Sequence, residues 1–505
     1  MQYGFLIDHR RCIGCHACTV ACKAENDVPV GDFRTWVQYA EHGRYPAVKR
    51  HFAVLRCNHC TNAPCVTICP VNALEKRDDG IVDLDRDACI GCRACMQGCP
   101  YDAIYLNEDS GSAEKCHYCA HRTEQGLEPA CVIVCPEGAI VPGDLQNPES
   151  RIAQMVAELD TEVRRPEQNT GPNVHYVGHE PSMLRPGSAE RPETYIWSER
   201  PDDKPEAWPE ELATVPDARV VLDTGHKVEW GWHVAAYLVT KGIAAGAAML
   251  APFAAFLGLS GFAHDYLPEL IALVFTLATT WLLVDDLARP KLFLTLLTRP
   301  NTKSWLVKGA WILMAFSATV PLTLLARLIG LDGLAGFLRL VNVPLGMGVA
   351  GYTAFLFAQC EGRDLWQSKL LLPHLLVQAT MCGAAILMPF AGAPGWLAAI
   401  LVVGLTLHGL FAAAERNAVH STDNARQAAA FLPVVKIGPI AQPWKLATRA
   451  GILIPTMLVV AATRLPDSLE PAAVVVTGLA ALIAFAGLYL YEAVFVRAGQ
   501  LPPLS

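Results

Sequence analysis

The stretch Cys12-Ile-Gly-Cys15-His-Ala-Cys18-Thr-Val-Ala-Cys22 has the spacing C-x₂-C-x₂-C-x₃-C. Three cysteines on one tight loop can wrap three corners of a cubane iron–sulfur cluster, and a fourth thiolate must arrive from elsewhere. The run recurs, with variations, three more times: Cys57, Cys60, Cys65, Cys69; Cys89, Cys92, Cys95, Cys99; and Cys116, Cys119, Cys131, Cys135. Sixteen of the 18 cysteines therefore fall into four quartets, and the sequence predicts four [4Fe–4S] clusters.

The ligand sets follow from a rule for two-cluster ferredoxins, in which the last cysteine of each run binds the other cluster. We apply the rule with the quartets nested, first with fourth and second with third. The first set is then Cys12, Cys15, Cys18 and Cys135; the second Cys57, Cys60, Cys65 and Cys99; the third Cys89, Cys92, Cys95 and Cys69; the fourth Cys116, Cys119, Cys131 and Cys22.

Two other uses of cysteine fit the pattern less well. Zinc takes two C-x₂-C pairs per ion and gains nothing from a third cysteine at the same spacing. Disulfides are disfavoured because the chain starts Met-Gln-Tyr-Gly-Phe-Leu-Ile-Asp, with no apolar signal segment and no twin arginine before Cys12. Pro70, Pro100 and Pro136 follow the last cysteine of their runs, as in bacterial ferredoxins, whereas Lys23 breaks this habit.

The two halves of the 505-residue chain differ in composition. Nearly all the cysteine lies before residue 144, whereas residues 230–496 are rich in Leu, Ala, Val, Ile and Gly. The net charge of −8 gives no reason to expect nucleic acid as a partner. We expect an α+β double ferredoxin-like iron–sulfur domain over residues 1–143, followed by an all-α transmembrane bundle over residues 229–505.

Short apolar segments follow the cysteine runs and predict strands at Ala73-Leu74, Ile81-Val82-Asp83-Leu84, Ala103-Ile104-Tyr105-Leu106 and Ala139-Ile140-Val141. The insertion between Ala24 and Arg56 alternates like a small hairpin. Residues 144–228 contain many prolines and charges with few periodic apolar runs, so they predict an extended linker.

Eight apolar stretches are long enough, or nearly so, to cross a bilayer of roughly 30 Å. They lie at about 232–257, 267–285, 305–329, 338–358, 370–391, 395–414, 447–463 and 471–495. An even number of spans puts the head and the C-terminus on the same side of the membrane. We therefore expect a multi-pass protein in contact with membrane lipid.

Lysine and arginine in the connections indicate which side this is. Thirteen lie on the head's side: Arg219, Lys227, Arg289, Lys291, Arg299, Lys303, Arg363, Lys369, Arg416, Arg426, Lys436, Lys445 and Arg497. Only Arg327, Arg339 and Arg464 lie on the far side. The positive-inside rule then predicts a cytoplasmic head in a bacterial inner membrane.

The head resembles the iron–sulfur subunit of complex iron–sulfur molybdoenzymes, such as dimethyl sulfoxide, polysulfide, tetrathionate and nitrate reductases. The resemblance rests on four quartets whose second reads C-x₂-C-x₄-C-x₃-C and whose fourth reads C-x₂-C-x₁₁-C-x₃-C. It implies an electron-transfer subunit that connects a molybdopterin catalytic partner to a membrane anchor. It also implies that the first and fourth clusters face this partner.

The membrane half is similar to NrfD-like, or polysulfide reductase-type, anchors. The matching features are Trp232, Gly242 and Gly246; Asp286-Leu-Ala-Arg-Pro290; Arg299-Pro-Asn-Thr-Lys-Ser304; Gly309-Ala-Trp311; Val343-Pro-Leu-Gly; and Tyr352. This resemblance implies an eight-helix anchor without haem, with a site for menaquinone or ubiquinone near the head.

Candidate residues for the quinone site gather at the head-side ends of the spans. His233, Tyr237 and Lys241 share one face of the first helix because they are spaced four residues apart. A lysine at membrane depth costs about 2.5–3.5 kcal/mol on insertion scales, so it is expected to face a partner or a wet cavity. We assign the site to His233, Tyr352 and Asp285, with Lys241 deeper. The alternative is that these side chains are interfacial anchors and loop caps.

A second polar group, His374 with Gln378 and His408 with Glu415, also shares helix faces. It predicts either a second polar cavity or, less in keeping with the anchor family, a pair of haem b ligands. Cys360 and Cys382 have no partner at cluster spacing and are interpreted as plain apolar residues.

The sequence thus predicts an electron-transfer and membrane-anchor subunit that passes electrons between a molybdopterin partner and quinone. Alone, it would catalyse at most quinone reduction or quinol oxidation. One alternative is a redox-driven proton-translocating module that uses Lys241, His374, His408 and Glu415. Another is a stand-alone polyferredoxin that serves many soluble donors.

Overall fold

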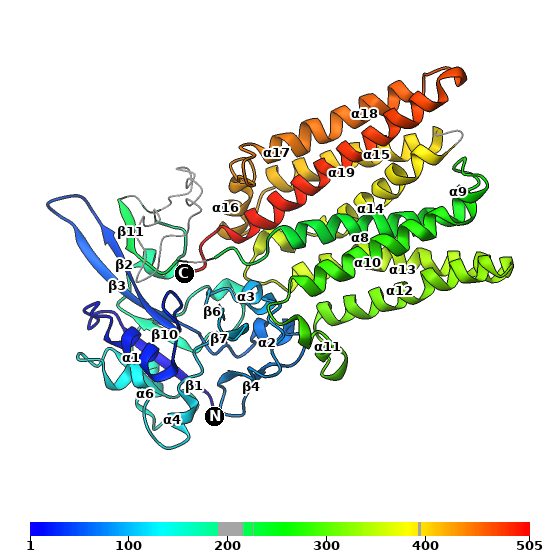
Figure 1. Ribbon diagram of the computed structural model, residues 1–505. Coiled ribbons are helices and arrows are strands. Elements are labelled where there is room, and N and C mark those ends of the chain that lie inside the picture. Colours follow the sequence, from blue (N-terminus) through cyan, green and yellow to red (C-terminus); the bar gives the residue numbers. More distant parts are fainter. Residues whose placement is uncertain (190–214, 216, 226, 392–394) are drawn as a thin grey trace.

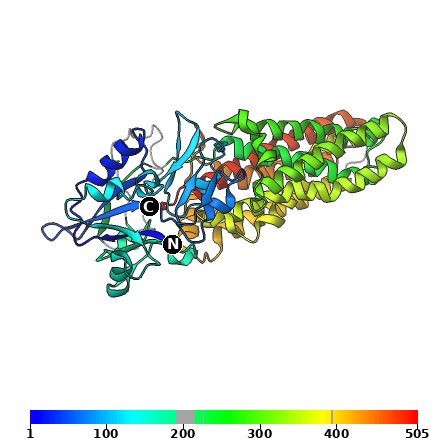
Figure 2. The same ribbon diagram turned by 90° about the horizontal axis from the view of Figure 1, so that it is seen from below.

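The computed structural model describes residues 1–189, 215, 217–225, 227–391 and 395–505. A head containing the four cysteine runs sits at one end of a bundle of long helices (Figures 1 and 2). The N-terminus lies in the head, and the C-terminus returns to it. The expected fold class, an α+β head followed by a helical membrane part, is confirmed.

One sheet of the head joins segments that are far apart in the sequence. Its strands, in order, are β8 (Ile140–Asp144), β1 (Tyr3–Asp8), β10 (Val174–Val177) and β9 (Thr161–Glu162). β1 is antiparallel to β8 and parallel to β10. Phe5 and Ile7 pack into a core with Cys18 and Cys131, whereas Leu6 points to the opposite face. Both faces of β1 are therefore covered, which explains its continuous apolar run.

The predicted short strands are present. β4 (Leu74–Lys76) pairs with β5 (Val82–Leu84), and β6 (Ile104–Asn107) pairs with β7 (Ser112–Lys115). The expected hairpin consists of β2 (Thr35–His42) and β3 (Lys49–Arg56), and β11 (Ala218–Leu222) adds a third strand beside β2. The helices of the cysteine runs are α1 (Ala17–Asn26), α2 (Pro64–Ile68), α3 (Ala94–Gly98), α4 (Ala120–Thr123) and α5 (Ala130–Ile133).

The structure differs from the expected extended linker over residues 144–228. Its described part contains α6 (Arg151–Glu158), β9, β10, α7 (Pro181–Leu184) and β11, and all three of these strands extend sheets of the head. Val174 and Tyr176 of β10 are fully buried beside β1. Four-residue strands set between prolines carry too little periodicity to be recognised from sequence. The rest of the expected linker, residues 190–214, 216 and 226, lies outside the described residues.

Eight helices of the described chain are long and apolar enough to span a membrane, as predicted. The spans are built on α8 (Trp232–Leu250), α10 (Leu267–Asp285), α12 (Trp305–Leu328), α13 (Asp332–Ala358), α14 (Leu371–Leu387), α15 (Gly395–Asn417), α17 (Pro443–Lys445) continuing into α18 (Gly451–Ala462), and α19 (Glu470–Gln500). Shorter helices between the spans are α9 (Phe262–Asp265), α11 (Thr295–Thr298) and α16 (Asp423–Phe431).

The fourth span begins earlier than expected. Arg339, which the sequence analysis placed in a far-side connection, lies inside α13 and is 4% exposed. Its Nε donates to Glu269 Oε1 at 2.6 Å. The charge of Arg339 is therefore paired inside the bundle, which a count of charges along the sequence cannot detect.

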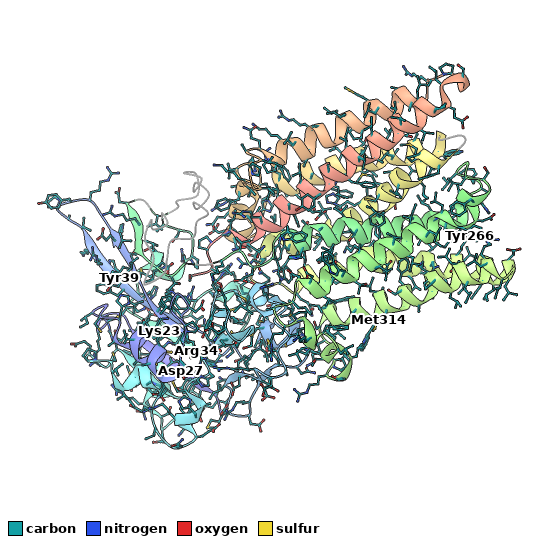
Figure 3. All side chains as sticks on the ribbon, viewed as in Figure 1. Lys23, Asp27, Arg34, Tyr39, Tyr266 and Met314 are labelled. Atoms are coloured by element: carbon teal, nitrogen blue, oxygen red, sulfur yellow. The ribbon has the colours of Figure 1, made fainter. Side chains whose placement is uncertain are left out.

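The connections assigned to the head's side do contact the head. Asn301 Nδ2 donates to the carbonyl oxygen of Cys69 at 2.7 Å, and Arg299 pairs with Asp85 at 3.0 Å. Tyr266, by contrast, lies at the end of the bundle remote from Lys23 and Arg34 of the head (Figure 3). The long axis of the bundle therefore separates a head-side end from a far end.

Candidate iron–sulfur and quinone sites

The four cysteine runs share one backbone feature. Two residues after the first cysteine of each run, φ is positive: 70° at Gly14, 45° at His59, 70° at Gly91 and 60° at Tyr118. This left-handed conformation turns the chain sharply between the first two cysteines. The same loop is thus built four times, by glycine in two runs and by larger residues in the others.

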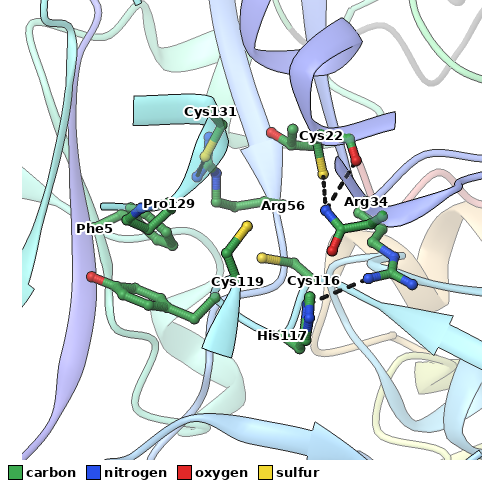
Figure 4. Close-up of a pocket in the computed structure, with 12 residues that line it drawn as sticks. Phe5, Cys22, Arg34, Arg56, Cys116, His117, Cys119, Pro129 and Cys131 are labelled. Atoms are coloured by element: carbon green, nitrogen blue, oxygen red, sulfur yellow. Dashed lines mark hydrogen bonds between the residues drawn. The ribbon is translucent and has the colours of Figure 1, made fainter. Parts of the chain in front are cut away.

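Two pockets gather cysteines from both ends of the head's sequence. One is lined by Cys12, Cys15, Cys18 and Cys135, the members of the first set. The other is lined by Cys22, Cys116, Cys119 and Cys131, the members of the fourth set (Figure 4). Each pocket therefore combines a cysteine run with a single cysteine from the run at the opposite end of the head.

The cysteines of the second and third sets also lie near one another. Burial, with Cys57 and Cys99 nearby, raises the pKa of Cys60 to about 12. Burial and the proximity of Cys89 and Cys69 likewise raise the pKa of Cys92 far above its ordinary value. The structure thus brings together the members of each predicted set.

The chemistry of these sites suits a bound cationic iron centre. A buried thiolate is unstable without a neighbouring positive charge, as the raised pKa of Cys18, about 12 and caused first by burial, illustrates. Hydrogen-bond donors already point at several sulfur atoms: Arg56 Nη1 at Cys131 Sγ (3.3 Å), Ala139 N at Cys135 Sγ (3.3 Å) and Ala113 N at Cys89 Sγ (3.5 Å). Such donors are the usual surroundings of cluster ligands, so the residues fit the group.

The second and third sets lie against the membrane part. Arg289 Nη1 donates to the carbonyl oxygen of Cys89 at 3.0 Å, and Trp230 Nε1 donates to that of Cys92 at 3.3 Å. With the bond from Asn301 to Cys69, three cysteines of the third set are tied to residues of the membrane half. These contacts place the third set directly against the membrane half.

A buried polar joint locks this contact. Gln97, between Cys95 and Cys99, donates to Gln500 Oε1 at 3.0 Å and accepts from Arg363 Nε at 2.9 Å. Gln500 in turn donates to Trp230 O at 2.8 Å, and Arg363 Nη1 donates to Gln500 O at 3.1 Å. We call these four residues the Gln97–Gln500 joint. It connects a cysteine run to the start of the first span and the end of the last.

The predicted quinone residues form two groups. His233 Nε2 lies 3.1 Å from Asp285 Oδ2, and His233 Nδ1 lies 3.4 Å from Asp286 Oδ1. Asp286 also connects to the head, because Arg93 Nη1 donates to its carbonyl oxygen at 2.8 Å. Arg93 directly follows Cys92 in the third cysteine run. Burial raises the pKa of Asp286 to about 6. The sequence analysis assigned Asp285 but not Asp286 to the quinone site, although Asp286 has the less exposed side chain.

The second group surrounds Tyr352. Lys241, 1% exposed, donates to Ala350 O at 3.2 Å and to the Thr353 hydroxyl, and its Nζ lies 4.8 Å from the centre of the Tyr352 ring. A Cβ added at Gly309 would overlap that ring, so only glycine leaves room for it there. No hydrogen bond between His233 and Tyr352 occurs among the described residues.

The second polar group is assembled in the interior of the bundle. His374 Nε2 lies 2.8 Å from His408 Nδ1, and His374 Nδ1 lies 3.2 Å from Glu415 Oε1. Gln378 contacts His374 at 3.3 Å, and the Tyr491 hydroxyl donates to Glu415. The two imidazole rings thus hydrogen bond to each other directly, and the group forms a buried polar network. Cys360 and Cys382 are fully buried, as expected for apolar residues.

Comparisons with known proteins agree with this division. Residues 48–145 match a 4Fe-4S dicluster domain, and residues 220–500 match the family described as Polysulphide reductase, NrfD. A tetrathionate reductase subunit of Salmonella typhimurium is 44% identical over 202 residues, which cover 39% of this chain and 80% of the relative. One polypeptide of the polysulfide reductase of Wolinella succinogenes is 38% identical over 173 residues, which cover 34% of this chain and 90% of the relative.

A third relative is named for electron transfer. The thiosulfate reductase electron transfer subunit of Salmonella typhi is 44% identical over 173 residues, covering 34% of this chain and 88% of that protein. The dicluster match lies in the head, whereas the NrfD match covers the membrane half. This chain therefore joins two units in one polypeptide.

Proposed function

Because this protein belongs to the polysulphide reductase NrfD family and carries an iron–sulfur electron-transfer head, we propose that it passes electrons between a molybdopterin catalytic subunit and membrane quinone. Four [4Fe–4S] clusters, one in each ligand set, would carry the electrons. Each such cluster, when bound, exchanges one electron at a time. The observation that carries the proposal is the contact chain from Cys92 through Arg93 and Asp286 to His233.

The residues of the quinone site have distinct roles in this proposal. His233 is positioned by two carboxylates, so it can donate a hydrogen bond to one quinone oxygen and exchange a proton through them. The hydroxyl of Tyr352 serves the other oxygen, with Lys241 holding positive charge beside the ring. Asp285 and Asp286 lie at the head-side end of α10, where they can exchange protons with water.

The catalytic partner is expected on the outer face of the head. Ile13, Val20, Ile133 and Val134 are exposed apolar side chains next to cysteines of the first and fourth sets. Exposed apolar patches on a soluble surface often mark protein contacts. Helix α1, which carries Val20, lies on the side of the head away from the membrane helices (Figure 1).

The orientation belongs to the same proposal. The head-side connections carry the excess of lysine and arginine, and by the positive-inside rule they face the cytoplasm of a bacterial cell. The protons taken up or released at Asp285 and Asp286 would then exchange with the cytoplasm.

Iron analysis tests the cluster count directly. Purified anaerobically, the chain is expected to hold about sixteen iron atoms. The variants Cys22→Ser and Cys99→Ser are each expected to lose or convert one cluster, from the fourth and the second set respectively. Cys382→Ser, a buried cysteine outside the sets, is the matched control and should retain all the iron. Zinc in place of iron, or equal loss in the control, would contradict the assignment.

A second candidate function, redox-driven proton translocation, is favoured by the buried network around His374. His374, His408, Glu415, Gln378 and Tyr491 are all at most 5% exposed, and each hydrogen bonds within the group. Glu492, 3% exposed, follows Tyr491, and its Oε1 has no hydrogen-bond partner among the described residues. Buried ionisable groups in a membrane domain are expensive and therefore indicate a function.

Replacing Glu415 with Gln separates the two functions. In vesicles containing the complete complex, Glu415→Gln is expected to abolish proton movement beyond that of quinone chemistry while leaving electron transfer within about twofold of the original rate, because its carboxylate lies outside the quinone site. Proton movement is followed with a pH-sensitive dye in the vesicle lumen. A wild-type chain that moves only the protons of quinone chemistry would rule out this second function.

A further inference from the structure

Two buried cations occupy equivalent places in the internal repeat. Arg56 ends β3 and directly precedes Cys57, the first cysteine of the second run. Lys115 ends β7 and directly precedes Cys116, the first cysteine of the fourth run. Their exposed fractions are 0% and 3%. Such burial of charge is costly, so a compensating partner must be close.

Arg56 reaches away from its own run to the fourth set. Its Nη1 donates to Cys131 Sγ at 3.3 Å, and its guanidinium stacks on the Phe5 ring at 4.4 Å (Figure 4). Its Nε and Nη2 have no hydrogen-bond partner among the described residues. Burial alone would lower the pKa of Arg56, but the nearby Cys131, Cys116 and Cys18 raise it above its ordinary value.

Lys115 reaches in the opposite direction, toward the second set. Its Nζ donates to the carbonyl oxygens of Cys116, at 2.8 Å, and Val82. The Val82 amide donates at 3.1 Å to His59 Nδ1, in the loop between Cys57 and Cys60. Burial raises the pKa of the Cys57 thiol, and Lys115 pulls it back toward its ordinary value.

Neither cation has a carboxylate partner within the described part of the chain. Arg34, which also lines the fourth-set pocket, differs in this respect because its Nη2 is paired with Glu114 Oε2 at 2.7 Å. The charge of Arg34 is therefore neutralised locally. The charges of Arg56 and Lys115 are left to be balanced by cysteine sulfur and by what the cysteines hold.

We propose that Arg56 and Lys115 are positioning residues for electron transfer that supply positive charge crosswise, Arg56 to the fourth cluster site and Lys115 to the second. This inference rests on the four-cluster proposal above. The one-electron-reduced state of each site carries one more negative charge than the oxidised state, and no bond or proton need change. A buried cation close to a site therefore favours reduction of that site.

The crosswise arrangement also places both cations between the fourth cluster site and the second. Cys57 of the second set and Cys116 of the fourth lie close enough for their charges to interact. An electron moving between these two sites would pass from the neighbourhood of one cation to that of the other. By raising the midpoint potentials of both cluster sites, the two cations stabilise the reduced state of each site. Electrons can then pass between the two sites in either direction.

Redox titration followed by electron paramagnetic resonance tests the proposal on the full chain. Arg56→Gln is expected to lower one midpoint potential so that, at fixed ambient potential, the reduced-to-oxidised ratio falls about tenfold, equivalent to about 59 mV for one electron. Lys115→Gln is expected to lower a different midpoint by a similar amount. Arg56→Lys and Lys115→Arg keep the charge and should keep each midpoint near the original value.

Iron content, measured on the same preparations, separates this test from that of the cluster count. Fewer clusters in the unaltered chain would contradict the proposed function and leave the midpoint comparison of the remaining clusters valid. Unmoved midpoints in iron-replete glutamine variants would overturn the cation proposal. A shift of the same midpoint by both glutamine variants would also overturn it, as would equal shifts in the charge-keeping variants. Loss of iron from both glutamine variants would indicate a structural role and would overturn it too.

Discussion

Replacing His233 with Ala is expected to lower the rate at which quinol reduces the clusters of the head about 10²- to 10⁴-fold, the usual loss when a positioned proton-transfer group is removed. His233 lies at the head-side end of α8 and contacts the carboxylates of Asp285 and Asp286. Rapid mixing of the purified chain with quinol, followed by the visible absorbance of the clusters, measures this rate without any catalytic partner.

A matched control exists at the other end of the bundle. His264 lies in α9, next to Tyr266 at the far end, so His264→Ala is expected to leave the rate unchanged. Tyr352→Phe, which keeps the ring between Lys241 and Gly309 but removes the hydroxyl, should fall in the same range as His233→Ala. If both variants reduce the clusters as fast as the original chain, the quinone site lies elsewhere.

Replacing Arg34 with Met is expected to destabilise the head by up to about 3–5 kcal/mol, because it leaves the buried carboxylate of Glu114 with only the exposed Arg86, at 3.4 Å, as its cation. The side chains of Arg34 and Glu114 are at most 3% exposed, and Tyr105 and Asn107 also hydrogen bond to Glu114. Anaerobic denaturation, followed by loss of cluster absorbance, measures the change. The double variant Arg34→Met with Glu114→Leu should recover most of the loss, since no unpaired charge remains.

The same pair has a pH signature. Burial alone would raise the pKa of Glu114, but hydrogen bonds from Tyr105 and Arg34 lower it below its ordinary value overall. A lowered folded-state pKa gives stability that is complete above the unfolded pKa of about 4.3 and is lost as the pH falls through the folded value. The acid-induced loss should be smaller in the double variant. Equal stability of Arg34→Met and the original chain would show that the pair contributes nothing.

Much of the architecture could be predicted because its signals are local. Cysteine spacing is read within a few residues, and a span of about 20 apolar residues is visible without any knowledge of its neighbours. The short strands after the cysteine runs could also be anticipated, since Val82 and Ile104 begin small apolar segments. The same locality explains why Arg339 was counted among the charges of a far-side connection, although Glu269 neutralises it inside the bundle.

The parts that were missed depend on contacts between distant residues. β10 is four residues long and becomes a strand only by pairing with β1, about 170 residues earlier in the chain. Gln97 and Gln500 are separated by 403 positions, and neither belongs to a motif. Asp286 was passed over because its burial depends on Arg93 of the head.

One missed feature did leave a readable signal. A basic residue stands immediately before the first cysteine of the first, second and fourth runs, at Arg11, Arg56 and Lys115, and Arg11 is exposed whereas the other two are buried. In the third run the same position is Ala88, so the repeat itself distinguishes the runs. Burial could not be read from the sequence, because strand-terminal arginine and lysine are usually exposed to solvent.

The last helix has a consequence for how far the redox centres stand from the lipid. α19 comprises 31 residues, which at 1.5 Å each give about 46 Å, more than the roughly 30 Å of hydrocarbon. Its final turns, from Tyr491 to Gln500, are nearly all buried, and its last residue, Gln500, accepts a hydrogen bond from Gln97 of the head. The height of the inner clusters above the bilayer is thus built into one helix, so deletion of a single turn would lower or detach the whole head.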